Sequence, residues 1–120
     1  MMEESIANAK VLLDDAKKNI FEKGFIDKEL LVWAQEVSMK NKYRNMFFGV
    51  KDGKFMILPI TDLKTPNYEE VKYYAKEEID LKPHIQSTMK IRIRGGGAVK
   101  YIILHPQSVS ELRTILTMFS

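Results

Sequence analysis

The feature that most constrains the fold is the stretch "KIRIRGGGAVKYIILH", residues 90–105, in which three glycines separate two alternating segments. Successive side chains of an extended strand point to opposite faces. Ile91 and Ile93 alternate with basic residues before the glycines, and a second alternating run begins at Val99. Glycine adopts positive φ without strain, which suits Gly95–Gly97 to a tight or bulged loop. The stretch therefore predicts a β-hairpin within an antiparallel sheet.

A glycine run beside arginines also suggests a phosphate-binding loop, but the flanking sequence argues against one. The P-loop and the dinucleotide fingerprint both lead from a strand into a helix whose N-terminus faces phosphate. Here the glycines lead into "AVKYIILH", which has the pattern of a strand, and the P-loop pair of lysine and hydroxyl residue is missing. The glycines are therefore interpreted as a turn.

A second hairpin is predicted over residues 46–60, "MFFGVKDGKFMILPI". Two runs rich in β-forming residues flank Asp52-Gly53, and both positions of this dipeptide tolerate the positive φ of a two-residue hairpin turn. Pro59 has no N–H to donate to a neighbouring strand. The second strand is therefore expected to end at Pro59 or to lie at the edge of the sheet.

Three other segments have less regular patterns. Residues 29–38 predict a strand in their second half, with a short helix from Asp27 as the alternative. The polar residues 40–44 suit a connecting loop. The stretch "EVKYYAKEEIDLKPHI", residues 70–85, predicts two short strands with a break near Glu77-Glu78, and a charged helix over residues 68–80 is the alternative.

Helices are predicted at both ends of the chain. Apolar residues recur at helical spacing over residues 3–23, and Gly24 is a typical C-terminal stop. Residues 108–111, Ser-Val-Ser-Glu, form a capping box, which predicts the start of the final helix. The apolar stripe of that helix, which we expect to dock on the sheet, contains Val109, Leu112, Leu116 and Phe119.

Length and composition predict one compact domain. A chain of 120 residues with 45% hydrophobic and 29% charged residues is long enough to bury a core. Residues 1–25 are assigned to an amphipathic helix packed on the domain, and residues 26–120 to the sheet and the C-terminal helix. Packing of the first helix against a second copy of the chain is the alternative. Without cysteine, a secretion signal or a transmembrane segment in the sequence, we expect a cytoplasmic protein.

The order of elements over residues 29–119 resembles the pleckstrin-homology-like (PH-like) superfold, and in particular small bacterial PH-like domains of uncertain function. The matching pieces are the two hairpins, "YYAKEEIDL" and the final "SVSELRTILTMF". The resemblance is one of pattern, without a diagnostic motif, and the N-terminal helix lies outside it. It implies an α+β fold in which a strongly bent antiparallel sheet, or partly open barrel, is capped at one end by the C-terminal helix.

Basic residues suggest two candidate sites for an anionic ligand. Residues 81–120 contain six Lys and Arg against the single acid Glu111. Alternate residues of the predicted strand form a basic strip that could contact phosphates, and a lysine across the hairpin extends it. The strip consists of Lys90, Arg92, Arg94 and Lys100. A solvated outer face whose charges discourage edge pairing is the favoured interpretation of these residues.

The second candidate is the K-x-K-x-R arrangement of Lys40, Lys42 and Arg44. The PH-like resemblance implies that this segment is the first loop between strands, where eukaryotic lipid-binding members place basic residues that hold inositol phosphates. The motif is short, and a solvated loop is the favoured interpretation. These three residues are nevertheless the predicted headgroup site if the protein has one.

No motif points to catalysis, a metal site or a cofactor. His84 and His105 stand apart, without the spacing of metal ligands. Glu69-Glu70 and Glu77-Glu78 are adjacent pairs, and adjacent residues of a strand point in opposite directions. The sequence therefore predicts a non-enzymatic binding or protein-interaction module that binds another protein or a second copy of itself. An anionic-ligand binder, acting on lipid headgroups or nucleic acid, is the alternative.

Overall fold

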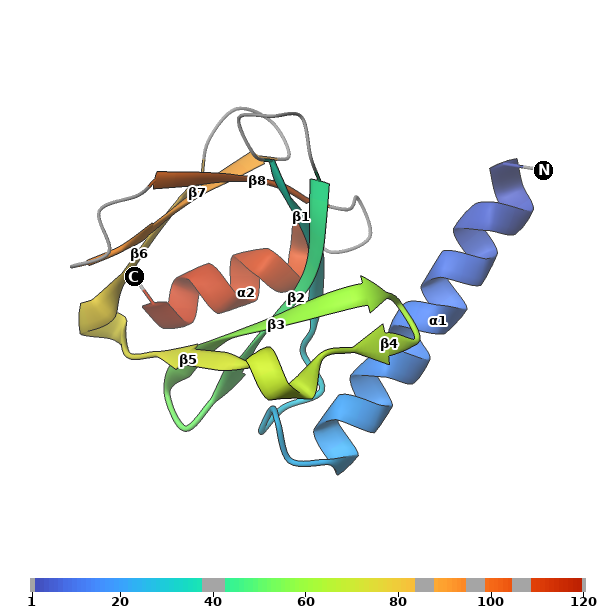
Figure 1. Ribbon diagram of the computed structural model, residues 1–120, viewed down its shortest axis with the longest axis horizontal. Helices are drawn as coiled ribbons and strands as arrows, with labels where there is room; N and C mark the ends of the chain where they lie inside the picture. Colours follow the sequence, from blue (N-terminus) through green and yellow to red (C-terminus); the bar gives the residue numbers. More distant parts are fainter. Residues whose placement is uncertain (1, 38–42, 84–87, 95–98, 105–108, 120) are drawn as a thin grey trace.

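The computed structural model describes residues 2–37, 43–83, 88–94, 99–104 and 109–119 (Figure 1). It has a helix at each end and an antiparallel sheet between them, so the predicted α+β class is confirmed. The elements in chain order are α1 (Met2–Glu22), β1 (Val32–Val37), β2 (Tyr43–Lys51), β3 (Lys54–Asp62), β4 (Thr65–Pro66), the 3₁₀ helix η1 (Tyr68–Glu70), β5 (Lys72–Tyr74), the 3₁₀ helix η2 (Lys76–Glu78), β6 (Ile79–Pro83), β7 (Thr88–Ile93), β8 (Val99–Leu104) and α2 (Val109–Phe119).

The strands of the described residues form one curved sheet in the order β4-β3-β2-β1-β8-β7-β6, and β5 also pairs with β3. β1 pairs with both β2 and β8, so the first strand joins the two hairpins. The sheet bends around α2, which lies in its hollow (Figure 1). No ladder joins β5 to β6 among the described residues, so the barrel is open on that side.

The central strands are buried on both faces because α1 and α2 cover opposite sides of the sheet. Met46 and Phe48 of β2 pack with Ile115 of α2 on the inner face, whereas Phe47 packs with Ile20 of α1 on the outer face. Leu13 and Ala16 of α1 are also buried in the outer cluster. The first helix therefore packs on its own sheet. Neither α1 nor α2 is long and apolar enough to cross a membrane.

Both predicted hairpins are present. Asp52 and Gly53 have φ values of 53° and 73°, and Lys51 pairs with Lys54 across this two-residue turn. β7 and β8 pair antiparallel as far as Arg92 and Val99. The glycines between them, Gly95–Gly97, lie outside the described residues.

The stop after α1 is a Schellman motif, as the glycine predicts. Gly24 has a φ of 81°, and its N–H donates to the carbonyl of Phe21 at 3.0 Å. The N–H of Phe25 donates to the carbonyl of Ile20 at 3.2 Å. These two bonds satisfy carbonyls that a helix end otherwise leaves without a partner.

The prediction for Pro59 is wrong. β3 continues through it to Asp62, with β2 on one side. On the other side, Pro59 falls between Ile57, which pairs with β5, and Ile60, which pairs with β4. The carbonyl of Pro59 accepts a hydrogen bond from the N–H of Asn67 at 2.9 Å. The strand tolerates proline here because no residue of β4 or β5 is paired directly opposite it.

The structure also decides between the alternatives for residues 68–80 and corrects the prediction for residues 40–44. The two predicted short strands are β5 and β6, and the break between them is η2, so a helix over residues 68–80 is excluded. The predicted loop at 40–44 is wrong for Tyr43 and Arg44, which begin β2 and pair with β1. Cross-strand pairing outweighs the polar character of these residues.

Candidate functional site

A cavity of about 450 Å³ opens on the inner face of the sheet, next to the region that α2 covers. Its volume lies within the range of roughly 300–1,000 Å³ that ligand-binding pockets occupy. The side chains that line it come from five strands and η1: Glu36, Arg44, Met46, Ile57, Pro59, Glu69, Glu70, Lys72, Tyr74, Ile91 and Ile93.

The strand period explains why charged and apolar side chains meet in this cavity. Val32 and Ala34 of β1 are inner-face core residues, and the next residue on that face is Glu36. On β2, the inner-face series that contains Met46 begins at Arg44, which lies directly across from Glu36 in the ladder. The inner face therefore changes from apolar to charged where α2 no longer covers it.

The opposite wall of the cavity is formed by η1 and β5. Glu70 accepts a hydrogen bond from Arg44, with 2.9 Å between Oε2 and Nη2. Their side chains are 53% and 58% exposed, so water screens the pair and its contribution to stability is small. Lys72 and Tyr74 complete this wall.

Glu69 and Glu70 both line the cavity, contrary to the expectation that adjacent residues face opposite ways. That expectation assumes a strand, but these residues belong to the 3₁₀ helix η1, where neighbouring side chains are separated by about a third of a turn. The two carboxylates therefore lie at the same rim of the cavity. This arrangement could not be predicted without knowing the local backbone.

The structure does not bring the two groups of basic candidates together. Arg44 lines the cavity, whereas Lys90 and Arg92 alternate along β7 with the cavity residues Ile91 and Ile93 and so point to the other face. Lys40 and Lys42 lie outside the described residues, and so does the side chain of Lys100.

Arg94 pairs with Asp80 of the neighbouring strand β6. Its Nη2 and Nε donate to the two oxygens of Asp80 at 2.7 and 3.4 Å. This hydrogen bond, together with the positive charges of Arg94, Lys82 and Arg92, holds the pKa of the Asp80 carboxyl below its usual value. The predicted phosphate contact at Arg94 is therefore already occupied by a carboxylate of the same chain.

We expect Arg94→Gln to raise the pKa of Asp80 toward the ordinary value for aspartate. Because the folded-state pKa is lowered, the pair contributes stability above that ordinary value and loses it as the pH falls through the lowered one. An NMR titration of the carboxyl carbons measures the shift directly. Arg113→Gln, which removes an exposed cation from α2, is the control and leaves the Asp80 titration unchanged.

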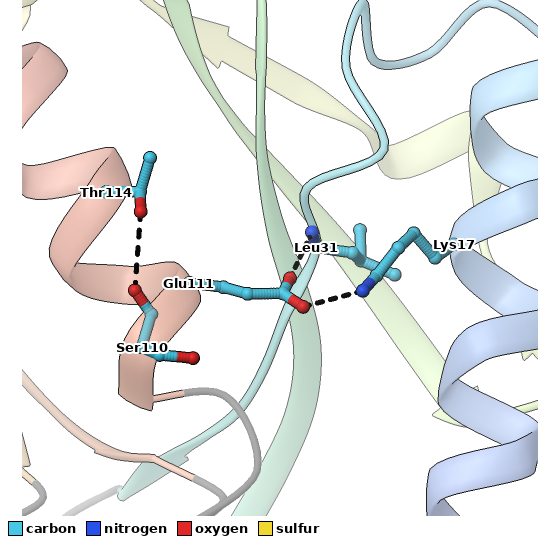
Figure 2. Close-up of polar contacts among 5 residues, drawn as sticks. All are labelled: Lys17, Leu31, Ser110, Glu111 and Thr114. Atoms are coloured by element: carbon cyan, nitrogen blue, oxygen red, sulfur yellow. Dashed lines mark hydrogen bonds and ion pairs between the residues drawn. The ribbon is translucent and has the colours of Figure 1, made fainter.

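Sequence reasoning missed the role of Glu111. The capping-box prediction pairs it with Ser108, which lies outside the described residues. Figure 2 shows its carboxylate between α2, α1 and the residue that precedes β1: Oε2 accepts from the N–H of Leu31 at 2.8 Å, and Oε1 accepts from Lys17 Nζ at 2.6 Å. Its partners are 80 and 94 residues away in sequence, so no local pattern identifies them.

No group of three or more His, Cys, Asp or Glu side chains in the described ranges is arranged to hold a metal ion. His84 and His105 lie outside those ranges. Comparisons of the chain with protein-family models, with curated proteins and with solved structures found no match. The site therefore has to be interpreted from its own geometry.

Proposed function

We propose that this chain is a non-enzymatic binding module of PH-like architecture, and that its ligand site is the cavity on the inner face of the sheet. The observation that carries the proposal is the composition of that cavity: an apolar floor that includes Met46, Ile57 and Ile91, below a rim of charged side chains. Binding pockets commonly combine apolar burial with a few polar groups that orient the ligand.

The PH-like assignment rests on the arrangement of elements. A bent antiparallel sheet is followed by a single helix that fills one part of its hollow, and the barrel stays open between β5 and β6. Since such barrels support many roles, the function is argued from the cavity and not from the fold. A protein partner in the bacterial cytoplasm is part of this proposal.

The exposure of the charged rim favours binding over catalysis. Catalytic acids and bases are usually held where burial or a close like charge shifts their pKa by several units. Arg44, Glu69, Glu70 and Lys72 are all exposed. Their charges are thus well hydrated and suited to attracting a ligand.

The sequence-based alternative, an anionic-ligand binder, is the weaker proposal. Two of its predicted cations, Arg44 and Arg94, are paired with Glu70 and Asp80. Arg92 remains exposed on the outer face of β7, away from the cavity. An anion bound to Arg92 would therefore not use the cavity on the inner face.

An NMR screen with small apolar and amphipathic fragments tests the cavity as a ligand site. We expect the bound fragments to shift the amide resonances of cavity-lining residues. Ile57→Phe fills part of the cavity. It is expected to lower the affinity of the bound fragments about tenfold, which corresponds to roughly 1.4 kcal/mol. Val11→Phe adds a ring at an exposed position of α1 and is the matched control. Shifts confined to residues that do not line the cavity, or no shifts at all, contradict the proposal.

A further inference from the structure

We infer that the cavity binds an extended segment of a partner protein in which an aliphatic side chain and a Lys or Arg side chain point to the same side. This inference rests on the proposed function and names the class of ligand. Three features of the cavity carry it: the sign of the charge at its rim, the character of its floor and the unpaired strand edge beside it.

The rim is acidic although the chain as a whole is basic. The chain has a formal net charge of +3, but three of the five charged side chains that line the cavity are glutamates. Of the two cations, Arg44 is bonded to Glu70 and lies across the ladder from Glu36. A cationic group entering the cavity therefore meets an excess of negative charge, whereas a phosphate or carboxylate is repelled.

The floor suits an aliphatic side chain. Met46 and Ile91 are buried, and Ile57 and Ile93 are partly buried around them. Methionine is flexible enough to adapt its shape to a range of apolar groups. An aliphatic group placed on this floor loses contact with water without leaving a polar group unpaired.

The strand edge distinguishes a polypeptide from a small amine. β5 pairs with β3 on one side, and among the described residues no strand pairs with its other side. Lys72 and Tyr74 of this short strand line the cavity. An extended segment that adds to the free edge of β5 forms main-chain hydrogen bonds there, and every second side chain enters the cavity.

The test titrates the 120-residue chain, labelled with ¹⁵N, with three probes. The first is the peptide Ac-LTRTL-NH2, whose leucines and arginine share one face of an extended strand. The second is Ac-LTETL-NH2, which reverses the charge, and the third is hexylamine, which keeps an apolar chain and a cation but has no backbone. We expect Ac-LTRTL-NH2 to bind at least about fivefold more tightly than Ac-LTETL-NH2, as expected for a partly screened charge contact. We also expect it to shift the amides of β5.

Glu69→Lys is the matched variant, because this side chain is exposed and its replacement leaves the core intact. It is expected to abolish the preference for Ac-LTRTL-NH2, whereas Glu29→Lys, an exposed change outside the cavity lining, preserves it. Tighter binding of Ac-LTETL-NH2, or binding of hexylamine alone, overturns the inference but leaves the cavity as a ligand site. If no probe and no fragment shifts the cavity residues, the proposed function fails as well.

Discussion

Replacement of Glu111 with alanine is expected to lower the free energy of unfolding by about 2–3 kcal/mol. The Glu111 carboxylate accepts hydrogen bonds from the N–H of Leu31, a fully buried residue, and from Lys17 (Figure 2). Alanine leaves the Leu31 N–H without this acceptor and removes the partner of an ammonium group whose side chain is only 19% exposed. Urea unfolding followed by circular dichroism measures the loss.

Two further variants separate the contributions of the hydrogen bond and the ion pair. Glu111→Gln retains an oxygen for the Leu31 N–H, so its loss is expected to be about half that of the alanine variant. Arg113→Ala, on an exposed position of the same helix, is expected to change stability by no more than about 0.5 kcal/mol. A Glu111→Ala variant as stable as Arg113→Ala would show that the carboxylate does not hold α2 to α1 and to Leu31.

Gly49→Ala is expected to destabilise the fold by about 1–3 kcal/mol, because β2 has no space for a side chain at this position. A Cβ at Gly49 would lie 2.6 Å from Cγ2 of Ile26 and 3.4 Å from Cε of Met56. Ile26 is branched at Cβ and buried, so its methyl group cannot move away without disturbing the outer core. The segment that follows α1 packs against β2 at this point.

A double-mutant cycle with Ile26→Ala tests this explanation. Ile26→Ala removes the methyl group that a Gly49 side chain would meet, so Gly49→Ala is expected to be neutral or stabilising in that background. Gly53→Ala is the control for glycine chemistry: Gly53 has a φ of 73°, and a Cβ there would meet no atom within 4 Å, so its cost comes from the backbone alone. An equal effect of Gly49→Ala in both backgrounds is the result that rules out steric crowding.

The features that sequence reasoning predicted are those set by a few neighbouring residues. Asp52-Gly53 specifies a turn because of its own backbone preferences, and Gly24 ends α1 in the same way. Pro59 shows the limit of this logic. Its missing N–H is evident from the sequence, but the effect of that missing donor depends on which residues of β4 and β5 lie opposite.

Most residues of the candidate site could not be predicted from local sequence patterns. Of the predicted basic residues, Arg44 lies in the cavity, and it does so as the first inner-face residue of β2 and not as part of a loop. The position of Glu36 could have been predicted, because Glu36 continues the alternation of Val32 and Ala34 and so places a charge on the inner face. No sequence pattern indicated the orientation of Glu69, because that orientation depends on the 3₁₀ helix η1.

By itself, the sequence determined the two hairpins and the helices at both ends of the chain, because periodicity and backbone preference act over a few residues. Only the tertiary structure decided that Glu36, Arg44, Tyr74 and Ile93 surround one cavity and that Glu111 bonds both Lys17 of α1 and Leu31, the residue before β1. These groups meet because the sheet, in which β1 pairs with β2 on one side and with β8 on the other, curves around α2. Contacts of this kind depend on the summed packing of residues far apart in the chain.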